Sequence, residues 1–263
     1  MGDLGMSKGI DVRGQPLAGG KEPLICTPLV ARDEPSILRE VAVVCAKCPD
    51  LIEWRVDFFA GIADSTRVVA LAREIRKQAG SVPIIFTRRS TREGGEPIGI
   101  AEEQVLSLYR AVCETGCVDF VDYEINGEPQ HFQAARQAAH HSGAQLIASF
   151  HDFQQTPPAA EIVARLVTME EAGADIAKVA VTPRAIDDVL TLLGATLAGS
   201  RQLRLPIISV SMGPYGSLSR LFGWTFGSSV TFAVGDKASA PGQVAIEDLR
   251  IVLDILRRSL AGK

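Results

Sequence analysis

Two ionisable side chains stand among apolar residues, where they could act together on a carbonyl compound. The stretch "QLIASFHDF" ends its apolar run at His151, and "DIAKVAV" holds Lys178 between aliphatic neighbours. An unpaired ammonium is costly to bury, and burial can lower a lysine pKa by up to roughly 3 to 5 units. A partly neutral lysine attacks carbonyl groups, and a histidine moves protons near neutral pH. The pair therefore predicts an enzyme in which Lys178 forms an imine with a ketone and His151 moves a neighbouring proton.

Charged residues gather at the ends of two other apolar runs. In "EWRVD", Glu53 and Arg55 are two positions apart and so point to the same face of a strand. In "TRRSTREGGE", Arg89 and Glu93 follow an apolar run and precede two glycines that allow a tight turn. The first pair is also explained by a structural ion pair, and the second by a solvated loop, so both interpretations stay open on the residues alone.

Later segments offer groups that could hold an anion. In "SMGPYGSLSRLFG", Gly213 and Gly216 precede a helical pattern and could cradle an anion at its N-terminus. Arg220 adds a two-pronged donor suited to carboxylate or phosphate. The loop "KASAPGQ" adds hydrogen-bonding groups on Ser239 and Gln243. An anionic handle on the substrate is the expectation that follows.

A repeating unit positions these residues. Eight short apolar runs, "PLICTPL", "LIEWRVDFF", "PIIFTRR", "VDFVDYEI", "QLIASFH", "DIAKVAV", "PIISVSM" and "SVTFAV", alternate with amphipathic helical patterns. Strands separated by helices must be parallel, and their near-continuous hydrophobicity indicates that both faces are covered. The pattern predicts an α/β fold, a single-domain (β/α)8 TIM barrel, for which about 250 residues is typical. An open doubly wound sheet is the alternative, weakened because no G-x-G-x-x-G follows the first strand.

Glycines punctuate this repeat. Gly80, Gly116, Gly143 and Gly173 each precede the next apolar run by a few residues, as expected of left-handed helix C-caps. In such a barrel, chemistry gathers at the C-terminal ends of the strands, which is where His151 falls. A single histidine is more often structural than catalytic, and a lysine near a strand end can extend to water, but this position favours catalytic roles.

Composition narrows the class of protein. The chain has 263 residues, a net charge of −4 and no basic stripe or long apolar segment, so neither nucleic acid nor a membrane is an expected partner. Five cysteines indicate reduced thiols in a cytoplasmic protein. No histidine spacing suits a metal, so we expect none. Residues 1–21 are rich in glycine and predict a flexible leader or partner-docking arm before a barrel domain at 22–263.

Six segments, in order and spacing, resemble type I 3-dehydroquinate dehydratase of the shikimate pathway, a family of the class I aldolase type. They are "EWRVD", "TRRSTREGGE", "SFHDF", "DIAKVAV", "SMGPYGSLSRLFG" and "KASAPGQ". The resemblance covers the chain from Pro23 to about Leu260. It implies conversion of 3-dehydroquinate to 3-dehydroshikimate and water, without metal or organic cofactor, by a homodimer in chorismate and aromatic amino acid biosynthesis.

The resemblance also implies a role for each candidate residue. Lys178 would form the imine with the C3 ketone, His151 would act as general base at C2 and then as acid toward the C1 hydroxyl, and Glu93 would orient His151. The substrate-binding residues would be Glu53, Arg55, Arg89, Met212, Arg220, Ser239 and Gln243. Two alternatives remain: a class I Schiff-base aldolase-type barrel acting on a phosphorylated sugar, and a non-catalytic barrel that binds a partner.

Overall fold

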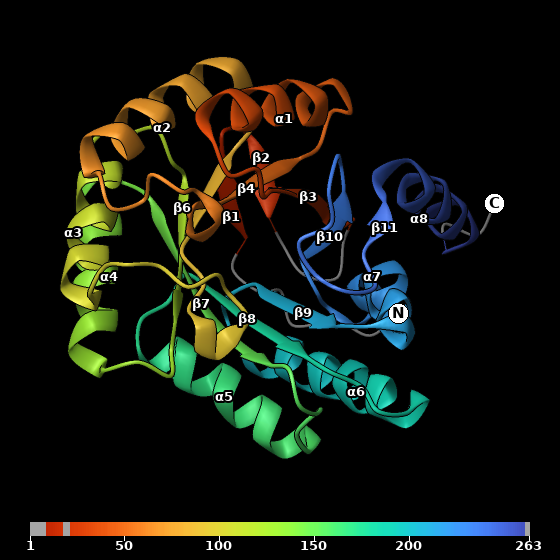
Figure 1. The fold of residues 1–263 in the computed structure, drawn as a ribbon. Coiled ribbons are helices and arrows are strands. Elements are labelled where there is room, and N and C mark those ends of the chain that lie inside the picture. Colours follow the sequence, from red (N-terminus) through yellow and green to blue (C-terminus); the bar gives the residue numbers. More distant parts are fainter. Residues whose placement is uncertain (1–8, 18–21, 261–263) are drawn as a thin grey trace.

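A ring of parallel strands forms the centre of the molecule, and helices surround it (Figure 1). This computed structural model describes residues 9–17 and 22–260. The eight apolar runs become eight successive strands, each hydrogen-bonded in parallel to its neighbour: β3 (Leu24–Leu29), β4 (Leu51–Arg55), β5 (Ile84–Thr87), β6 (Phe120–Glu124), β7 (Gln145–Asp152), β8 (Ile176–Val181), β9 (Ile207–Ser211) and β10 (Val230–Val234).

The ring closes between its last and first strands. β10 pairs with β3, and a parallel bridge joins Ile207 at the start of β9 to Ser228, just before β10. The backbone N–H of Ser229 donates to the Ile207 carbonyl at 2.7 Å. A sheet closed in this way has no exposed edge, and the predicted (β/α)8 barrel is confirmed.

Each strand leads into a helix on the outside of the ring. The helices are α1 (Glu34–Ala46), α2 (Ser65–Ala79), α3 (Glu102–Cys113), α4 (Pro129–His141), α5 (Ala159–Glu171), α6 (Ile186–Gln202), α7 (Ser217–Phe222) and α8 (Ile246–Leu260). Short 3-10 turns occupy Val56–Phe58, Thr91–Glu93, Pro214–Gly216 and Gly223–Phe226, and a two-residue strand, β11 (Val244–Ala245), pairs with β10. Within residues 9–17 and 22–260, no helix combines the length and apolar character that crossing a lipid bilayer requires.

Local chemistry sets the helix boundaries, as α2 illustrates. The Asp64 carboxylate accepts hydrogen bonds from the backbone N–H groups of Thr66 and Arg67, which would otherwise lack partners at the helix start. Gly80 ends the helix with φ 58°, a conformation that costs glycine no Cβ clash. Gly143 and Gly173 come directly after the last cap residues of α4 and α5, and Gly116 comes two residues after that of α3. All three have positive φ, so the left-handed glycines predicted at the helix ends are confirmed.

The inside of the barrel is filled in layers along each strand. The lower layer is apolar and includes Leu51, Ile85, Phe120, Ile147 and Ile176, all at most 1% exposed. Because side chains alternate between faces, the residue two positions later on each strand points into the same interior one layer higher. These upper residues are polar on β4 to β8, and they form the floor of the site described below.

A hairpin occupies part of the segment for which the sequence predicts a leader. Strands β1 (Ile10–Val12) and β2 (Gln15–Leu17) pair antiparallel through a turn at Arg13 and Gly14, both with positive φ. Val12 and Leu17 are buried in the lower apolar layer of the barrel, so this part of residues 1–21 packs on the barrel rather than extending freely. The remaining leader residues, 1–8 and 18–21, lie outside the described residues, and the division at 21/22 stays a prediction.

Candidate active site

A cavity opens at the C-terminal ends of the strands, and all ten candidate residues line it. They come from β4, from the segment after β5, from β7, β8 and α7, and from the segments after β9 and β10. The sequence-predicted site is therefore one pocket. The other lining residues are Gly94, Phe153, Ala180, Val210, Phe232 and Ala240.

Lys178 lies at the floor of this cavity and is only 4% exposed. Its Nζ donates to Asp122 Oδ2 at 2.8 Å and to Glu53 Oε1 at 3.3 Å, and it lies 4.7 Å from the centre of the Phe232 ring. Burial lowers the lysine pKa, but the negative charges of Asp122 and Glu53 outweigh it and raise the pKa above its ordinary value. The sequence-based expectation of a partly neutral lysine is thus wrong for the unliganded protein, because it took no account of partners from other strands.

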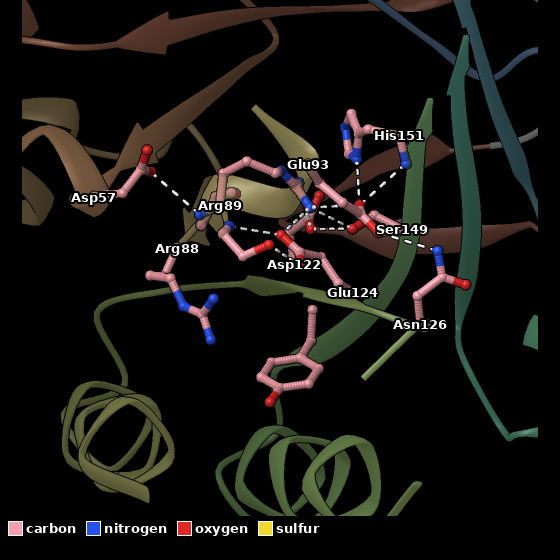
Figure 2. Close-up of polar contacts among 12 residues, drawn as sticks. Asp57, Arg88, Arg89, Glu93, Asp122, Glu124, Asn126, Ser149 and His151 are labelled. Atoms are coloured by element: carbon pink, nitrogen blue, oxygen red, sulfur yellow. Dashed lines mark hydrogen bonds and ion pairs between the residues drawn. The ribbon is translucent and has the colours of Figure 1, made fainter. Parts of the chain in front are cut away.

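Arg89, just after β5, joins polar residues of two further strands, β6 and β7, as Figure 2 shows. Its guanidinium donates to Asp122 at 2.7 Å and to Ser149 Oγ at 2.8 Å, and it lies 3.3 Å from Glu124. Glu124 also accepts from the backbone N–H and the hydroxyl of Ser90. Arg89 is 3% exposed, so the solvated-loop interpretation of this segment is wrong.

His151 and Glu93 form a close pair at the edge of the same cluster (Figure 2). The ring Nδ1 lies 2.9 Å from Glu93 Oε2, and the backbone N–H of His151 donates to the same oxygen at 3.0 Å. When Nδ1 donates to Glu93 Oε2, Nε2 keeps its lone pair and can accept a proton. Burial, with the positive charges of Arg89 and Lys178, holds the pKa of His151 well below its usual value, so the ring is neutral and competent as a base.

Glu93 is itself unusual for a carboxyl group. Burial, reinforced by the nearby charge of Glu124, raises its pKa to about 8 even though Arg89 opposes the shift. Asn126 Nδ2 donates to its second oxygen at 3.3 Å. Both oxygens are therefore held, which fixes the orientation of the His151 ring.

Glu53 and Arg55 do not pair with each other, so a direct structural ion pair between them is ruled out. Glu53 contacts Lys178 and accepts from the Thr87 hydroxyl at 3.0 Å. Arg55 instead makes a two-pronged contact with Asp57, at 2.8 and 2.7 Å. Both residues still present polar atoms to the cavity.

Arg220 differs from every other buried cation of the site. It is 3% exposed, and its only hydrogen bonds among the described residues are long ones to the carbonyls of Phe232 and Pro241, at 3.4 and 3.3 Å. No carboxylate in the described chain lies within ion-pair distance, and Nε has no partner. Burial alone lowers its pKa to about 10. This guanidinium is placed to receive an anion from outside the chain.

The segment after β10 lines part of the cavity through Ser239, Ala240 and Gln243. The backbone N–H of Ser239 donates to the Gln243 side-chain oxygen at 2.9 Å, and the Gln243 amide donates to the Ser239 hydroxyl at 3.1 Å. Gly242 passes so near the segment after β9 that an added Cβ would lie 2.0 Å from the Gly213 carbonyl oxygen.

The same close contact overturns the expected anion cradle. The Gly213 N–H donates to the Pro241 carbonyl at 3.1 Å, and the Gly216 N–H donates to the Gly213 carbonyl at 2.9 Å. Neither N–H is available to an anion. These glycines allow backbone segments to approach, and Arg220 is the group near them that could receive an anion.

Sequence reasoning missed the residues behind the lysine. Asp122, Ser149 and Glu124 carry the polar network, and Phe153, Val210 and Phe232 complete the wall of the cavity. A readable signal existed in "VDFVDYEI", since an aspartate two positions after a core phenylalanine in a strand covered on both sides must face the interior. In the part of the chain that the structure describes, no group of three or more His, Cys, Asp or Glu residues is arranged to hold a metal ion. The expectation of a site without metal or organic cofactor stays a prediction.

Together, the closed barrel and the charged cavity at the C-terminal ends of its strands define an enzyme of the (β/α)8-barrel class. The family model described as type I 3-dehydroquinase matches residues 25–259. The chain therefore belongs to the type I 3-dehydroquinase family, and the resemblance inferred from its motifs is confirmed.

Relatives that carry the family's name match nearly the whole chain. The 3-dehydroquinate dehydratase of Aromatoleum aromaticum is 64% identical over 260 residues, which cover 99% of this chain and 100% of the relative. The crystal structure of 3-dehydroquinate dehydratase from Geobacillus kaustophilus superimposes with a TM-score of 0.93 at 46% identity, covering 96% of this chain and 98% of that one. A type I 3-dehydroquinate dehydratase from Clostridium difficile, with covalently modified comenic acid, gives a TM-score of 0.91 at 36% identity, covering 96% and 99%.

Proposed function

We propose that the protein dehydrates 3-dehydroquinate to 3-dehydroshikimate through an imine on Lys178, with His151 as the proton carrier. The activity as such, that of a hydro-lyase, follows from family membership and from 64% identity to a full-length relative of that name. The roles of individual residues are the proposal. Family membership leaves the alternatives of a sugar-phosphate aldolase and a non-catalytic barrel without support.

The observation that carries these roles is the unpaired guanidinium of Arg220 in the cavity that also holds Lys178 and His151. Buried charges in proteins are normally paired, because a buried charge without a partner strongly destabilises the folded protein. Because the described chain supplies no partner, the bound substrate supplies it. The carboxylate of 3-dehydroquinate is such a group, and a two-pronged contact with Arg220 would orient the rest of the ring.

The arrangement then performs the reaction in balanced steps. The Lys178 ammonium first gives up one proton, and the freed amine bonds to the C3 carbonyl carbon. The carbonyl oxygen takes up two protons, the one released and a second from the nitrogen, and leaves as water, so that ammonium plus ketone gives protonated imine plus water. His151 removes a proton from C2, and the electron pair moves into the protonated C=N to give an enamine. The enamine electrons return to expel the C1 hydroxyl, which takes the proton from His151 and leaves as a second water. Hydrolysis of the imine consumes one water and regenerates the lysine.

The remaining cavity residues bind and orient the ring. Glu93 holds the His151 ring by its 2.9 Å contact, so that the nitrogen facing the cavity accepts the C2 proton. Glu53, Arg55, Arg89, Ser239 and Gln243 present donors and acceptors to hydroxyls and carboxylate, and Met212 packs against the ring. General acid–base help is typically worth 10² to 10⁴ in rate, so imine formation and positioning supply the rest.

The setting of the enzyme forms part of the proposal. It works in the cytoplasm, in chorismate and aromatic amino acid biosynthesis, which fits five free cysteines. It forms a homodimer, supported by the apolar Ile251, Ile255 and Leu260 that α8 exposes to solvent. Residues 22–263 are the catalytic domain, and residues 1–21 a leader whose described part packs on the barrel floor. Light scattering should give about twice the 28.1 kDa chain mass, and Ile251→Glu with Ile255→Glu should give monomers.

Reductive trapping tests the imine directly. Incubation with 3-dehydroquinate and borohydride should inactivate the protein and add the mass of the reduced ligand to the peptide that contains Lys178. The matched control is Lys178→Met, which should neither gain mass nor turn over substrate. A label on another residue, or turnover in Lys178→Met, would overturn the assignment.

A further inference from the structure

The strongest unassigned feature is a carboxylate buried behind the lysine. Asp122 on β6 is 0% exposed, and both of its oxygens are engaged: Oδ2 accepts from Lys178 Nζ at 2.8 Å, and Oδ1 accepts from Arg89 at 2.7 Å and from the Ser149 hydroxyl at 2.6 Å. Placing a carboxylate so deep carries a large desolvation cost. Neither the motif resemblance nor the family match gives this residue a role.

We propose that Asp122 is a catalytic residue, the fixed counter-ion that keeps positive charge on the Lys178 nitrogen, first as ammonium and then as protonated imine. This inference rests on the proposed imine chemistry. The charge on nitrogen is +1 on both sides of the balanced step, since ammonium plus ketone gives protonated imine plus water. One fixed anion therefore suits both states, and the protonated imine is the form that accepts the electrons released at C2.

Asp122 fits this role better than Glu53, the other anion beside the lysine. Glu53 is farther from Nζ, at 3.3 Å, and it lines the cavity, so substrate hydroxyls can draw it away. Asp122 is 0% exposed and is not among the residues that line the cavity. Figure 2 shows it enclosed between Arg89, Ser149 and Glu124. Its contact with the nitrogen is therefore independent of what fills the pocket.

The other charged groups around the nitrogen support a single fixed anion. Arg89 and His151 face it from the β5 and β7 sides, Glu53 from β4, while β9 and β10 contribute only the apolar Val210 and Phe232. Burial opposes ionisation of Asp122, but Arg89 and Lys178 prevail and hold its pKa well below the usual range. Asp122 thus stays an anion throughout and does not act as a base. When the C2 proton reaches His151, the positive charge stays within the field of Asp122, which favours the protonated ring.

Trace acylation of Lys178 tests the counter-ion without substrate. Acetic anhydride reacts only with the free amine, so the pH dependence of the labelling rate gives the lysine pKa, with exposed Lys77 as the reference in the same sample. In the wild-type protein, labelling of Lys178 should have a midpoint above that of Lys77. In Asp122→Asn the midpoint should fall by about 1 to 3 pH units, the usual effect of one opposite charge at close range.

Turnover supplies the second readout. Asp122→Asn should lower kcat about 10²-fold, as loss of one preorganised electrostatic group does, with KM changed less than about threefold because Asp122 does not touch substrate. The matched control is Asp119→Asn at the opposite end of the barrel, where the carboxylate pairs with Arg76; it removes a comparable ion pair and should leave kcat and the Lys178 midpoint unchanged.

Three results would overturn the proposal. These are an unchanged Lys178 midpoint in Asp122→Asn, a kcat within threefold of wild type, and labelling of wild-type Lys178 at neutral pH as fast as Lys77. The last result needs no variant, so it decides the matter even where Asp122→Asn fails to fold. A reduced-ligand adduct missing from Lys178 would sink the imine assignment, and the acylation result would still report on the ion pair.

Discussion

On β4 to β8, the two interior layers of the barrel come from the same strands and differ in chemistry. On β8, Ile176 lies in the lower layer and Lys178, two positions later, lies in the upper one; on β7 the corresponding residues are Ile147 and Ser149. The lower layer needs no partners, since apolar side chains are stabilised by burial alone. Among the residues that the structure describes, every charge facing the cavity has a partner of opposite sign except Arg220, which comes from α7.

The difference separates folding from chemistry along each strand. The lower layer closes the barrel and needs only shape and hydrophobicity, so substitution there acts on stability. The upper layer holds its charges in place before substrate arrives, so substitution there acts on catalysis. A site built on strands in this way holds its groups more precisely than one built on loops. Substitutions that give one layer the chemistry of the other, or that remove single side chains facing the cavity, test this separation.

The largest effect is expected from placing a charge in the lower layer. Ile176→Asp would bury a carboxylate with no partner among aliphatic side chains and should destabilise the protein by more than about 4 kcal/mol. Urea unfolding followed by circular dichroism measures this. Ile176→Val should cost only about 0.5 to 1.5 kcal/mol. A stable Ile176→Asp protein would show that the two layers are not distinct.

Removal of the base should abolish most turnover and leave the fold intact. His151→Ala should lower kcat by about 10²- to 10⁴-fold, the usual contribution of general acid–base catalysis, while borohydride still traps the Lys178 adduct slowly. His140→Ala, an exposed histidine that pairs with Asp175 outside the barrel, should turn over like the wild type. Full activity in His151→Ala would exclude it from the base role.

Replacement of the unpaired arginine should weaken substrate binding and stabilise the empty protein. In Arg220→Met, loss of a charged hydrogen-bonded contact should raise KM by about 10-fold to 100-fold. Because the wild-type guanidinium is buried without a carboxylate, the same change should raise the free energy of unfolding by about 1 to 2 kcal/mol. Steady-state kinetics and urea unfolding of one preparation measure both. An unchanged KM, or a less stable variant, would contradict the substrate-carboxylate role.

The smallest effect is expected from acid. Burial, Arg89 and Lys178 hold the pKa of His151 below 6.5, so the ring stays neutral as the pH falls through that value. Because the pKa of His151 in the folded protein lies below 6.5, the ring gains a proton, and loses its capacity to act as a base, only at more acidic pH. The plot of kcat/KM against pH should therefore be nearly level from pH 7.5 to 6. A decline of kcat/KM centred at pH 6.5, with no such change in a reaction without enzyme, would show that His151 titrates like an ordinary histidine and would contradict the prediction.

Much of the fold follows from sequence periodicity. All eight strands and all four glycine caps were predictable because each depends on residues close together in the chain. The hairpin at Ile10–Leu17 was not predicted, because two three-residue strands are too short to show a two-residue periodicity. The Arg13–Gly14 turn between them is the only local sign of a hairpin. Its stability comes from burial of Val12 and Leu17 in the barrel, a contact that no local pattern reveals.

The site was predictable in its members and not in its electrostatics. Motif spacing placed ten residues in one cavity, because parallel strands bring their C-terminal ends together. The protonation state of Lys178 was mispredicted because its partners Asp122 and Glu53 lie 56 and 125 positions away in sequence. A pKa depends on charges within a few ångströms, and only the closed barrel sets those distances.

A crystal structure of the borohydride-reduced adduct tests the central claim most directly. The account predicts continuous density from Lys178 Nζ to the ligand ring, the ligand carboxylate bonded to Arg220, and Asp122 still in contact with the nitrogen. Ligand attached to another residue, or a carboxylate bound away from an Arg220 that remains unpaired, would contradict it.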